Sequence, residues 1–312
     1  MYIPSLQWNI GGDVMFSLPN NATIIEVGPR DGLQNEKNLI ETNVKLDFIK
    51  CLQNSGITEM ELTSFVSPKW VPQMADAEKI VNKTAKVGRQ FVLAPNATGV
   101  ERAMENGADA IAVFVGVSHT FNKKNINKNT EEAMDSLAPV VAKLKKQGIF
   151  VRACISTAFY CPYEGKIEVE DTISLCKVFA SWGVDELSVA DTIGMANPVE
   201  SYTLFKRLKE ELPNLLLTAH FHDTRKMALA NIYAALQAGV DRFDTSAGGL
   251  GGCPFAKGAT GNVATEDVVH MLESIGVHTG IDVEKVCEAA KIVEPLISGT
   301  IDSGQFRLFK EK

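Results

Sequence analysis

The sequence has few cysteines, and none of them forms a CxxC pair. The six are scattered over 312 residues: Cys51, Cys154, Cys161, Cys176, Cys253 and Cys287. A scaffold held together by disulfides would be shorter and richer in cysteine. We therefore expect free thiols in a reducing compartment. A chain of this length can bury a full hydrophobic core without such staples.

An excess of basic residues and long apolar runs are also missing. The net charge is −7 at pH 7, which argues against a nucleic-acid partner because such proteins need a basic face. No apolar run approaches the length of a membrane span, so no membrane partner is expected. Residues 1–20 contain no Lys or Arg, unlike a signal peptide or a mitochondrial presequence. We predict a cytoplasmic, bacterial-type protein.

What the sequence does contain is a repeated alternation of short apolar runs with longer amphipathic stretches. The apolar runs predict strands at 23–29, 60–65, 90–95, 110–116, 150–156, 185–191, 215–221 and 242–247. The stretches between them, such as 43–56, predict helices. Several of these helices should end at glycine, namely at Gly107, Gly148, Gly183, Gly239 and Gly276. Strands that are apolar on both faces are typical of a parallel sheet.

About eight strand–helix units favour a closed α/β barrel, the TIM (β/α)8 fold, over an open doubly wound sheet. We predict a single domain over residues 1–312. The barrel would cover about 23–276. A C-terminal helical extension would cover 277–312 and include a helix at 282–298.

Polar residues at the ends of these strands are candidates for catalysis, because active sites of such barrels lie at the C-terminal strand ends. Arg30 and Asp31 follow the first strand, although an Asp-Gly turn with a surface ion pair would look the same. Glu61 interrupts the second strand; it must be paired if it faces inward, but it could also point outward. Asp191 ends the sixth strand and could instead cap a helix, because Asn197-Pro198 follows it.

The seventh strand ends in HFHD, which contains two of the five histidines of the chain. His220 and His222 are two residues apart, so a strand would place both imidazoles on one face. Such a pair is typical of half a metal site. A mixed nitrogen and oxygen ligand set would suit a divalent ion acting as a Lewis acid.

A run rich in glycine, GGLGGCPFAKGATGN, follows the eighth strand at 248–262. Its glycines permit tight backbone turns. It lacks the Gly-Lys-Ser/Thr ending of a phosphate-binding P-loop, because Gly258 follows Lys257. Cys253 within this run would be reactive only in an environment that tunes its thiol. Taken alone, it could equally be an inert small residue.

Together these motifs resemble the 3-hydroxy-3-methylglutaryl-CoA (HMG-CoA) lyase family, within the DRE-TIM metal-dependent lyases and synthases. The resemblance runs from about 23 to about 299. Its most specific stretches, in family order, are EVGPRDGLQNE, ELTSFVSPKWVPQMAD, KKNIN, CPYEGKI, HFHDT and the glycine-rich run. It implies a retro-Claisen cleavage of HMG-CoA to acetyl-CoA and acetoacetate. A lyase for citramalyl-CoA or methylmalyl-CoA, a related acyl-CoA/2-oxo acid synthase and a non-catalytic binding barrel are the alternatives.

The resemblance also implies a role for each matching position. The ligands of a divalent ion, Mg²⁺ or Mn²⁺, would be Asp31, His220, His222 and Asn262. The catalytic residues would be Arg30, Asp31, Glu61, Asp191, His220 and Cys253. Arg30 would stabilise the enolate, and Cys253 would protonate it. The acyl-CoA substrate would contact Arg30, Lys37, Asn122, Lys124 and Asn125. A homodimer is implied as well.

The sequence departs from the family pattern directly after the histidine pair. Many family members read HDTYGQALAN, whereas this chain reads HDTRKMALAN, with Arg225, Lys226 and Met227. The run at 118–127 also differs from the usual one. The first departure has two open interpretations: ordinary variation of a barrel loop, or a changed acyl preference.

Overall fold

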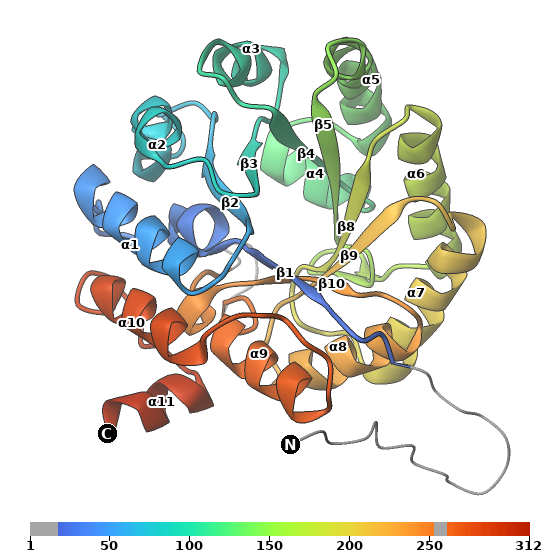
Figure 1. The fold of residues 1–312 in the computed structure, drawn as a ribbon. Coiled ribbons are helices and arrows are strands. Elements are labelled where there is room, and N and C mark those ends of the chain that lie inside the picture. The colour runs from blue at the N-terminus through green and yellow to red at the C-terminus, as the bar shows by residue number, and fades with distance from the viewer. Residues whose placement is uncertain (1–17, 253–260) are drawn as a thin grey trace, which may run out of the picture.

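A closed barrel of parallel strands forms the centre of the computed structural model, which describes residues 18–252 and 261–312. The strand order around the barrel is β1-β10-β9-β8-β5-β4-β3-β2, and helices surround it (Figure 1). The barrel strands are β1 (Thr23–Glu26), β2 (Glu59–Ser64), β3 (Arg89–Leu93), β4 (Ala110–Gly116), β5 (Phe150–Ser156), β8 (Glu186–Asp191), β9 (Leu216–Phe221) and β10 (Arg242–Thr245). The predicted TIM barrel is confirmed.

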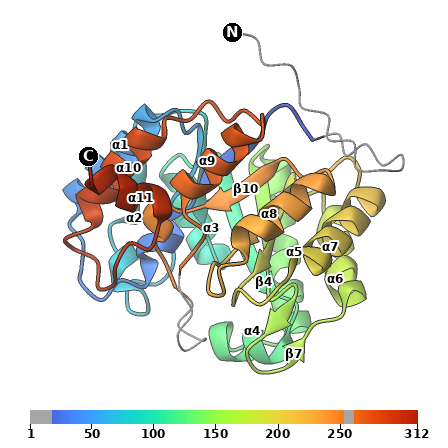
Figure 2. The same ribbon diagram turned by 90° about the horizontal axis from the view of Figure 1, so that it is seen from below.

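Helices follow each barrel strand along the chain. They are α1 (Thr42–Asn54), α2 (Ala77–Lys83), α3 (Ala97–Glu105), α4 (His119–Ile126), α5 (Thr130–Lys146), α6 (Val169–Ser181), α7 (Pro198–Glu211), α8 (Ala228–Gln237), α9 (Thr265–Ser274), α10 (Val283–Val293) and α11 (Gly304–Lys310). A small hairpin, β6 (Tyr160–Cys161) and β7 (Gly165–Lys166), lies beside α4 at one end of the barrel (Figure 2). Within the two described ranges, no helix is long and apolar enough to cross a membrane.

The glycines expected to end helices do so. Gly107, Gly148, Gly183, Gly239 and Gly276 each follow a helix with a positive φ, between 73° and 92°, which an L side chain adopts only at a cost. Most predicted boundaries lie within two residues of the observed ones, but two elements were predicted at least three residues too long. The strand predicted at 23–29 ends at Glu26, because Gly28–Gly32 forms a π-helical turn, η1. The helix predicted at 282–298 is α10, which ends at Val293 shortly before Pro295.

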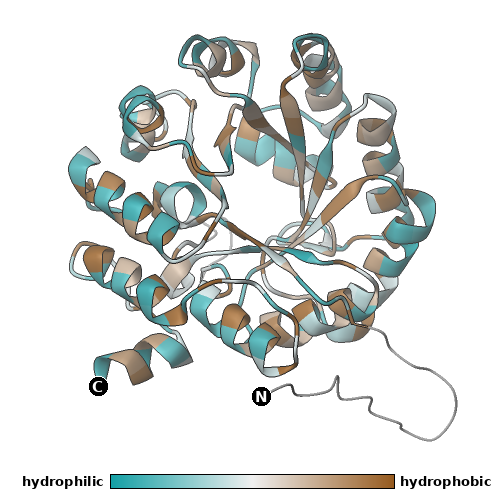
Figure 3. Ribbon diagram, in the orientation of Figure 1, coloured by the Kyte–Doolittle hydropathy of each residue, from teal (hydrophilic) through white to brown (hydrophobic). Residues whose placement is uncertain are grey.

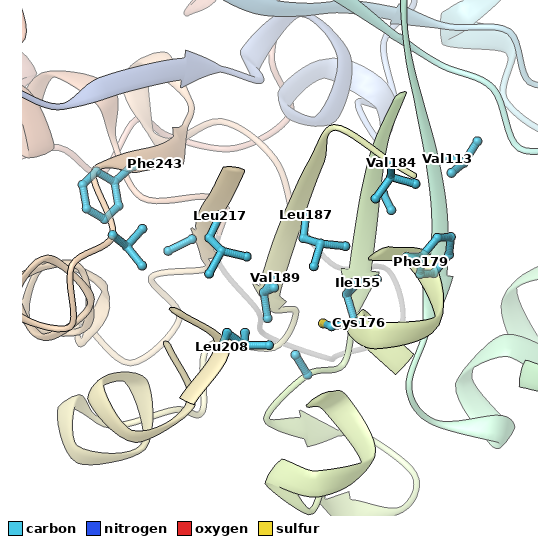
Figure 4. Packing of buried hydrophobic residues seen from close by; sticks show 14 of the residues in the cluster. Val113, Ile155, Cys176, Phe179, Val184, Leu187, Val189, Leu208, Leu217 and Phe243 are labelled. Atoms are coloured by element: carbon cyan, nitrogen blue, oxygen red, sulfur yellow. The ribbon is translucent and has the colours of Figure 1, made fainter. Parts of the chain in front are cut away.

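The outer faces of the strands carry most of the apolar core. Leu187, Val189 and Leu217 point outward and pack against Phe179 of α6 and Leu208 of α7 (Figure 4). In Figure 3 the strands are largely brown, whereas the helices carry both brown and teal residues, as amphipathic helices do. The alternation of side chains along a strand then turns every second residue into the barrel.

The barrel interior is apolar only in part, although the strands are mostly apolar and mostly buried, as expected. Ile25, Val27 and Phe91 form a small apolar cluster there. Arg152 of β5 instead pairs with Asp244 of β10. These two strands are not neighbours in the sheet, so their ion pair crosses the interior. The residues of the candidate site rest on these polar side chains of the barrel interior.

Of the last two helices, α10 packs on α1, the first helix of the barrel, and α11 packs on α10 and α9. Val286 and Ala290 of α10 share a buried cluster with Phe48 and Leu52 of α1, and Phe306 of α11 joins it. The division into a barrel over about 23–276 and an extension over 277–312 stays a prediction.

Candidate active site

The loop after β1 places Arg30 and Asp31 side by side. The carbonyl of Val27 accepts hydrogen bonds from the backbone N–H groups of Asp31 (2.7 Å) and Gly32 (3.1 Å), and the bond from Gly32, five residues on, closes η1. The buried carboxylate of Glu26 accepts from the N–H of Gly28 at 2.7 Å. A Cβ on Gly28 would lie 2.6 Å from that same carboxylate oxygen. A side chain at this position would displace that carboxylate, which also accepts hydrogen bonds from Ala247 N and Thr265 Oγ1.

Arg30 and Glu61 form a nearly buried ion pair that sequence reasoning left open. Arg30 Nη2 lies 2.7 Å from Glu61 Oε2, and Arg30 Nη1 lies 2.6 Å from Asp31 Oδ1. Glu61 is 1% exposed, so it faces inward and the outward interpretation was wrong. Burial lowers the pKa of Arg30, but the charges of Glu61 and Asp31 outweigh it and raise that pKa. The guanidinium is thus held in place and fully charged.

The four predicted metal ligands come together at the C-terminal end of the barrel. Ligand atoms of Asp31, His220 and His222 all lie within 4.8 Å of one another. Asn262 donates from Nδ2 to Asp31 Oδ2 at 2.8 Å, and its backbone forms a bridge with His222.

The donor atoms of this cluster fit a divalent cation. Asn262 Oδ1 and His222 Nδ1 are buried and have no hydrogen-bond partner in the part of the chain that the structure describes. A buried acceptor without a partner is costly unless a ligand occupies it. One carboxylate, one amide oxygen and two imidazoles suit Mg²⁺ or Mn²⁺ as well as softer divalent ions.

The electrostatics of the cluster also favour a cation. Burial raises the pKa of Asp31, but Arg30 and the two histidines outweigh burial and lower that pKa to about 2. Burial, together with the charge of His220, lowers the pKa of His222 to about 4. Burial also lowers the pKa of His220, but its hydrogen bond and attraction to Asp244 give a net increase. At neutral pH the site therefore offers an ionised carboxylate and a neutral His222.

The glycine-rich run is described only at its two ends. Gly248, Gly249 and Gly251 have φ values of 69°, 63° and 113°, and a Cβ on Gly251 would lie 2.8 Å from Asn262 Nδ2. Both observations explain why glycine is needed beside the metal ligands. Cys253 lies outside the described residues, and its catalytic role stays a prediction.

Asp191 shapes the loop after β8. Its two carboxylate oxygens accept hydrogen bonds from the N–H groups of Met195 (3.0 Å) and Ala196 (2.9 Å). Asn197, and not Asp191, is the N-cap of α7, so the helix-cap interpretation was wrong. Burial raises the pKa of Asp191 to about 6. A direct catalytic role for this carboxylate stays a prediction.

The residues proposed to bind the substrate differ in burial, from fully buried to exposed. Asn122 is fully buried and uses its amide to bond both backbone groups of Gly116, at 2.7 Å each, and Thr130 Oγ1 at 2.8 Å. Its contribution to substrate binding would therefore be indirect. Lys124 lies over the Tyr163 ring at 5.0 Å. Lys37 and Asn125 are exposed. Substrate contacts for Lys37, Lys124 and Asn125 stay predictions.

The departure from the family pattern has a local structural role. Arg225 Nη1 donates to the carbonyls of Ile193 (3.1 Å) and Gly194 (3.0 Å). Lys226 Nζ lies 2.7 Å from Asp302. Both side chains thus bind neighbouring segments of the chain.

Sequence reasoning missed Asp244, which lies beneath the cluster. Asp244 is 3% exposed, and its Oδ2 lies 3.0 Å from Nδ1 of His220. The signal that identified Glu61, a charged residue inside a buried strand, was present in RFDTSA and could have found it.

The fold and this cluster together define a TIM barrel with a candidate divalent-metal site at its mouth. The sequence model of the HMGL-like family matches residues 21–293. The chain is 44% identical to a hydroxymethylglutaryl-CoA lyase of Bacillus subtilis, over 94% of this chain and 98% of that protein. It is also 44% identical to the mitochondrial hydroxymethylglutaryl-CoA lyase of Homo sapiens, over 89% of this chain and 86% of that protein.

A solved structure supports the same relationship. The crystal structure of hydroxymethylglutaryl-CoA lyase from Pseudomonas aeruginosa matches with a TM-score of 0.91 at 38% identity, over 94% of this chain and 99% of that chain. The chain therefore belongs to the HMGL-like family of the DRE-TIM superfamily.

Proposed function

We propose that this protein is a metal-dependent lyase that cleaves HMG-CoA to acetyl-CoA and acetoacetate. The observation that carries the proposal is the convergence of Asp31, His220 and His222 within 4.8 Å, beside the Arg30–Glu61 ion pair. Similarity to HMG-CoA lyases over nearly the whole chain supports the choice of substrate.

The reaction is a retro-Claisen cleavage. The tertiary hydroxyl of the substrate loses a proton, the adjacent carbon–carbon bond breaks, and its electron pair moves into the thioester enolate. The enolate carbon then takes up a proton to give acetyl-CoA. A divalent ion held by Asp31, His220, His222 and Asn262 would supply Lewis-acid polarisation of the substrate oxygens.

Arg30 is the group we assign to the developing enolate charge. Its guanidinium is only 11% exposed and is fixed by carboxylates on either side. A preorganised cation in a site with little water stabilises an oxyanion more strongly than the same cation in solution. We place the base that accepts the hydroxyl proton in the Asp31–His220 neighbourhood, at the proposed metal cluster itself.

Cys253 is the proton donor that we propose for the enolate carbon. The family resemblance supports this role. Cys253→Ser should abolish most turnover and leave Mn²⁺ affinity unchanged. Turnover equal to that of the wild type would reject the role.

A product assay tests the function directly. The protein is incubated with Mg²⁺ and HMG-CoA, and acetoacetate and acetyl-CoA are measured; His222→Ala, which lacks a proposed metal ligand, is the negative control. Citramalyl-CoA and methylmalyl-CoA are assayed in parallel. Release of pyruvate or glyoxylate from these two thioesters, without acetoacetate from HMG-CoA, would reject HMG-CoA as the substrate. It would still support a lyase that cleaves a 3-hydroxyacyl-CoA. Assembly as a homodimer and a cytoplasmic location stay proposals.

A further inference from the structure

Asp244 of β10 contacts the imidazole of His220 from below the candidate metal site. Its Oδ2 lies 3.0 Å from His220 Nδ1, and Ser188 Oγ donates to the same oxygen at 2.7 Å. We propose that Asp244 is a positioning residue that fixes His220 as its Nδ1–H tautomer and turns Nε2 toward the metal. This inference rests on the proposed function, in which His220 is a metal ligand.

The tautomer follows from which groups can donate. An ionised carboxylate only accepts hydrogen bonds, so the proton between Asp244 and His220 belongs to Nδ1. The other ring nitrogen, Nε2, then carries the lone pair that a metal ligand needs. A carboxylate behind a ligating histidine fixes both the tautomer and the ring orientation.

Asp244 cannot turn away from His220, because an ion-pair network holds it from the other side. Arg152 donates from Nη2 to Asp244 Oδ1 and its guanidinium lies 5.1 Å from the centre of the Phe91 ring. Arg152 Nε is 3.3 Å from Glu186 Oε1.

The same network continues to the opposite end of the barrel. Arg242 Nη2 lies 3.3 Å from Glu186 and 2.5 Å from Glu59, and Arg89 lies 3.0 Å from Glu59. Charges therefore alternate from Arg89 to Asp244. This alternation compensates the buried charge of Asp244, and because Arg152 donates to Oδ1, Oδ2 can orient His220.

His220 and His222 differ in whether a carboxylate fixes the imidazole ring. His222 Nδ1 is buried and has no hydrogen-bond partner among the described residues. The ring of His222 lies 5.3 Å from that of His220, measured between their centroids. The orientation imposed by Asp244 therefore acts on only one of the two imidazoles, and a change at Asp244 should be visible at His220.

Mn²⁺ affinity of Asp244→Asn, measured by electron paramagnetic resonance of free Mn²⁺, is the first test. The dissociation constant should rise about 10–100-fold, as is typical when the partner of a ligating histidine is lost. Thr218→Val is the matched control, because Thr218 donates to Glu186 in the same network without touching His220. It should change the constant less than about twofold. Equal constants for Asp244→Asn and the wild type would overturn the proposal, as would an equal loss in Thr218→Val.

The tautomer itself is the second test, and a purely structural role of Asp244 would not change it. In ¹⁵N-histidine-labelled, Mg²⁺-loaded wild type, the His220 ring should carry its proton on Nδ1. His220→Gln assigns the signal among the five histidines. Asp244→Asn should shift the proton to Nε2 or to a mixture, and an unchanged Nδ1–H signal would overturn the proposal.

If Asp244→Asn fails to fold, Ser188→Ala provides an alternative test of the proposal. It removes one hydrogen bond from Asp244 and should weaken Mn²⁺ binding by a smaller factor than Asp244→Asn, about threefold to tenfold; wild-type affinity would overturn the proposal. His220→Gln with wild-type Mn²⁺ affinity would reject His220 as a ligand. These readouts need no thioester, so they remain separate from a failure to cleave HMG-CoA.

Discussion

Asn262 and Asp31 are 231 positions apart in the chain, and their side chains meet at 2.8 Å between Nδ2 and Oδ2. The contact joins the end of the glycine-rich run to the loop after β1. It uses the amide nitrogen, so Oδ1 of Asn262 remains buried and without a partner in the described ranges. One residue thus orients the carboxylate of Asp31, a proposed ligand, and presents a candidate ligand atom of its own.

Asn262→Ala should therefore weaken metal binding through two separate effects. It removes the free Oδ1 and releases Asp31 Oδ2, so we expect Mn²⁺ affinity to fall about 10–100-fold. Isothermal titration calorimetry with Mn²⁺ measures the change. Asn35→Ala is the control, because Asn35 Nδ2 donates to Gly252 O at 3.0 Å on the same segment without a place in the cluster. Wild-type affinity in Asn262→Ala would contradict the assignment.

Arg30→Lys should lower turnover and spare the metal site. A lysine keeps the charge but cannot bond Glu61 and Asp31 at once, so its ammonium would not be held against the enolate. We expect kcat to fall about 10²–10³-fold, the range seen when one oxyanion donor is lost. Acetoacetate release measures kcat, and Mn²⁺ affinity should change less than about threefold. Arg207→Lys alters an exposed ion pair on α7 and should leave kcat unchanged.

Much of the fold could be predicted from the sequence because its signals are local. Each of the five helix-ending glycines has a left-handed conformation that glycine adopts freely. These glycines therefore marked the ends of helices within the eight-unit repeat. The HxH spacing placed His220 and His222 on one strand face for a similar reason. In the strand at 23–29, the same reasoning failed, because the π-helical turn at Gly28–Gly32 depends on the carboxylate of Glu26.

The parts of the site that sequence reasoning missed depend on contacts across the barrel. Asp244 reaches His220 and Arg152 only because their strands close into a ring. Asn122 lies in a segment that the family resemblance assigned to substrate binding, yet its amide bonds the backbone of Gly116 instead. A motif identifies the residue type at a position, whereas the direction of its side chain is set by tertiary packing.

Glu266→Gln should stabilise the protein more as the pH rises. Glu266 is fully buried beneath the glycine-rich run, where Oε2 accepts from Gly248 N at 3.0 Å. Burial raises its pKa from 4.5 to about 7. The folded state therefore binds more protons than the unfolded state between these values, and the stability present below pH 4.5 is lost as the pH rises through 7.

The measurement is the difference in unfolding free energy between Glu266→Gln and the wild type, from urea denaturation. Groups common to both proteins, such as His222 with its lowered pKa, cancel in this difference. It should grow by about 1–3 kcal/mol between pH 5 and 8, since one pKa unit corresponds to about 1.4 kcal/mol. A difference that stays flat over this range would show that Glu266 does not titrate there.

Two side chains hold the loop after β8 through hydrogen bonds to its backbone. Arg225 bonds the carbonyls of Ile193 and Gly194, and Asp191 bonds the N–H groups of Met195 and Ala196. The departure from the family pattern at Arg225 therefore acts on the shape of this loop. A direct contact of Arg225 with the acyl group is not needed to explain it.

Arg225→Gln should accordingly reduce stability without changing the choice of substrate. Loss of two hydrogen bonds from a charged donor should cost about 1–2 kcal/mol of unfolding free energy in urea denaturation. Lys226→Gln, which breaks the ion pairs of the exposed Lys226 with Asp302 and Asp223, should cost less than about 1 kcal/mol. The ratio of kcat/KM for HMG-CoA to that for citramalyl-CoA should stay within about threefold in both variants, because neither side chain then contributes to acyl recognition. A shift of about tenfold in Arg225→Gln at unchanged stability would instead place Arg225 in acyl recognition.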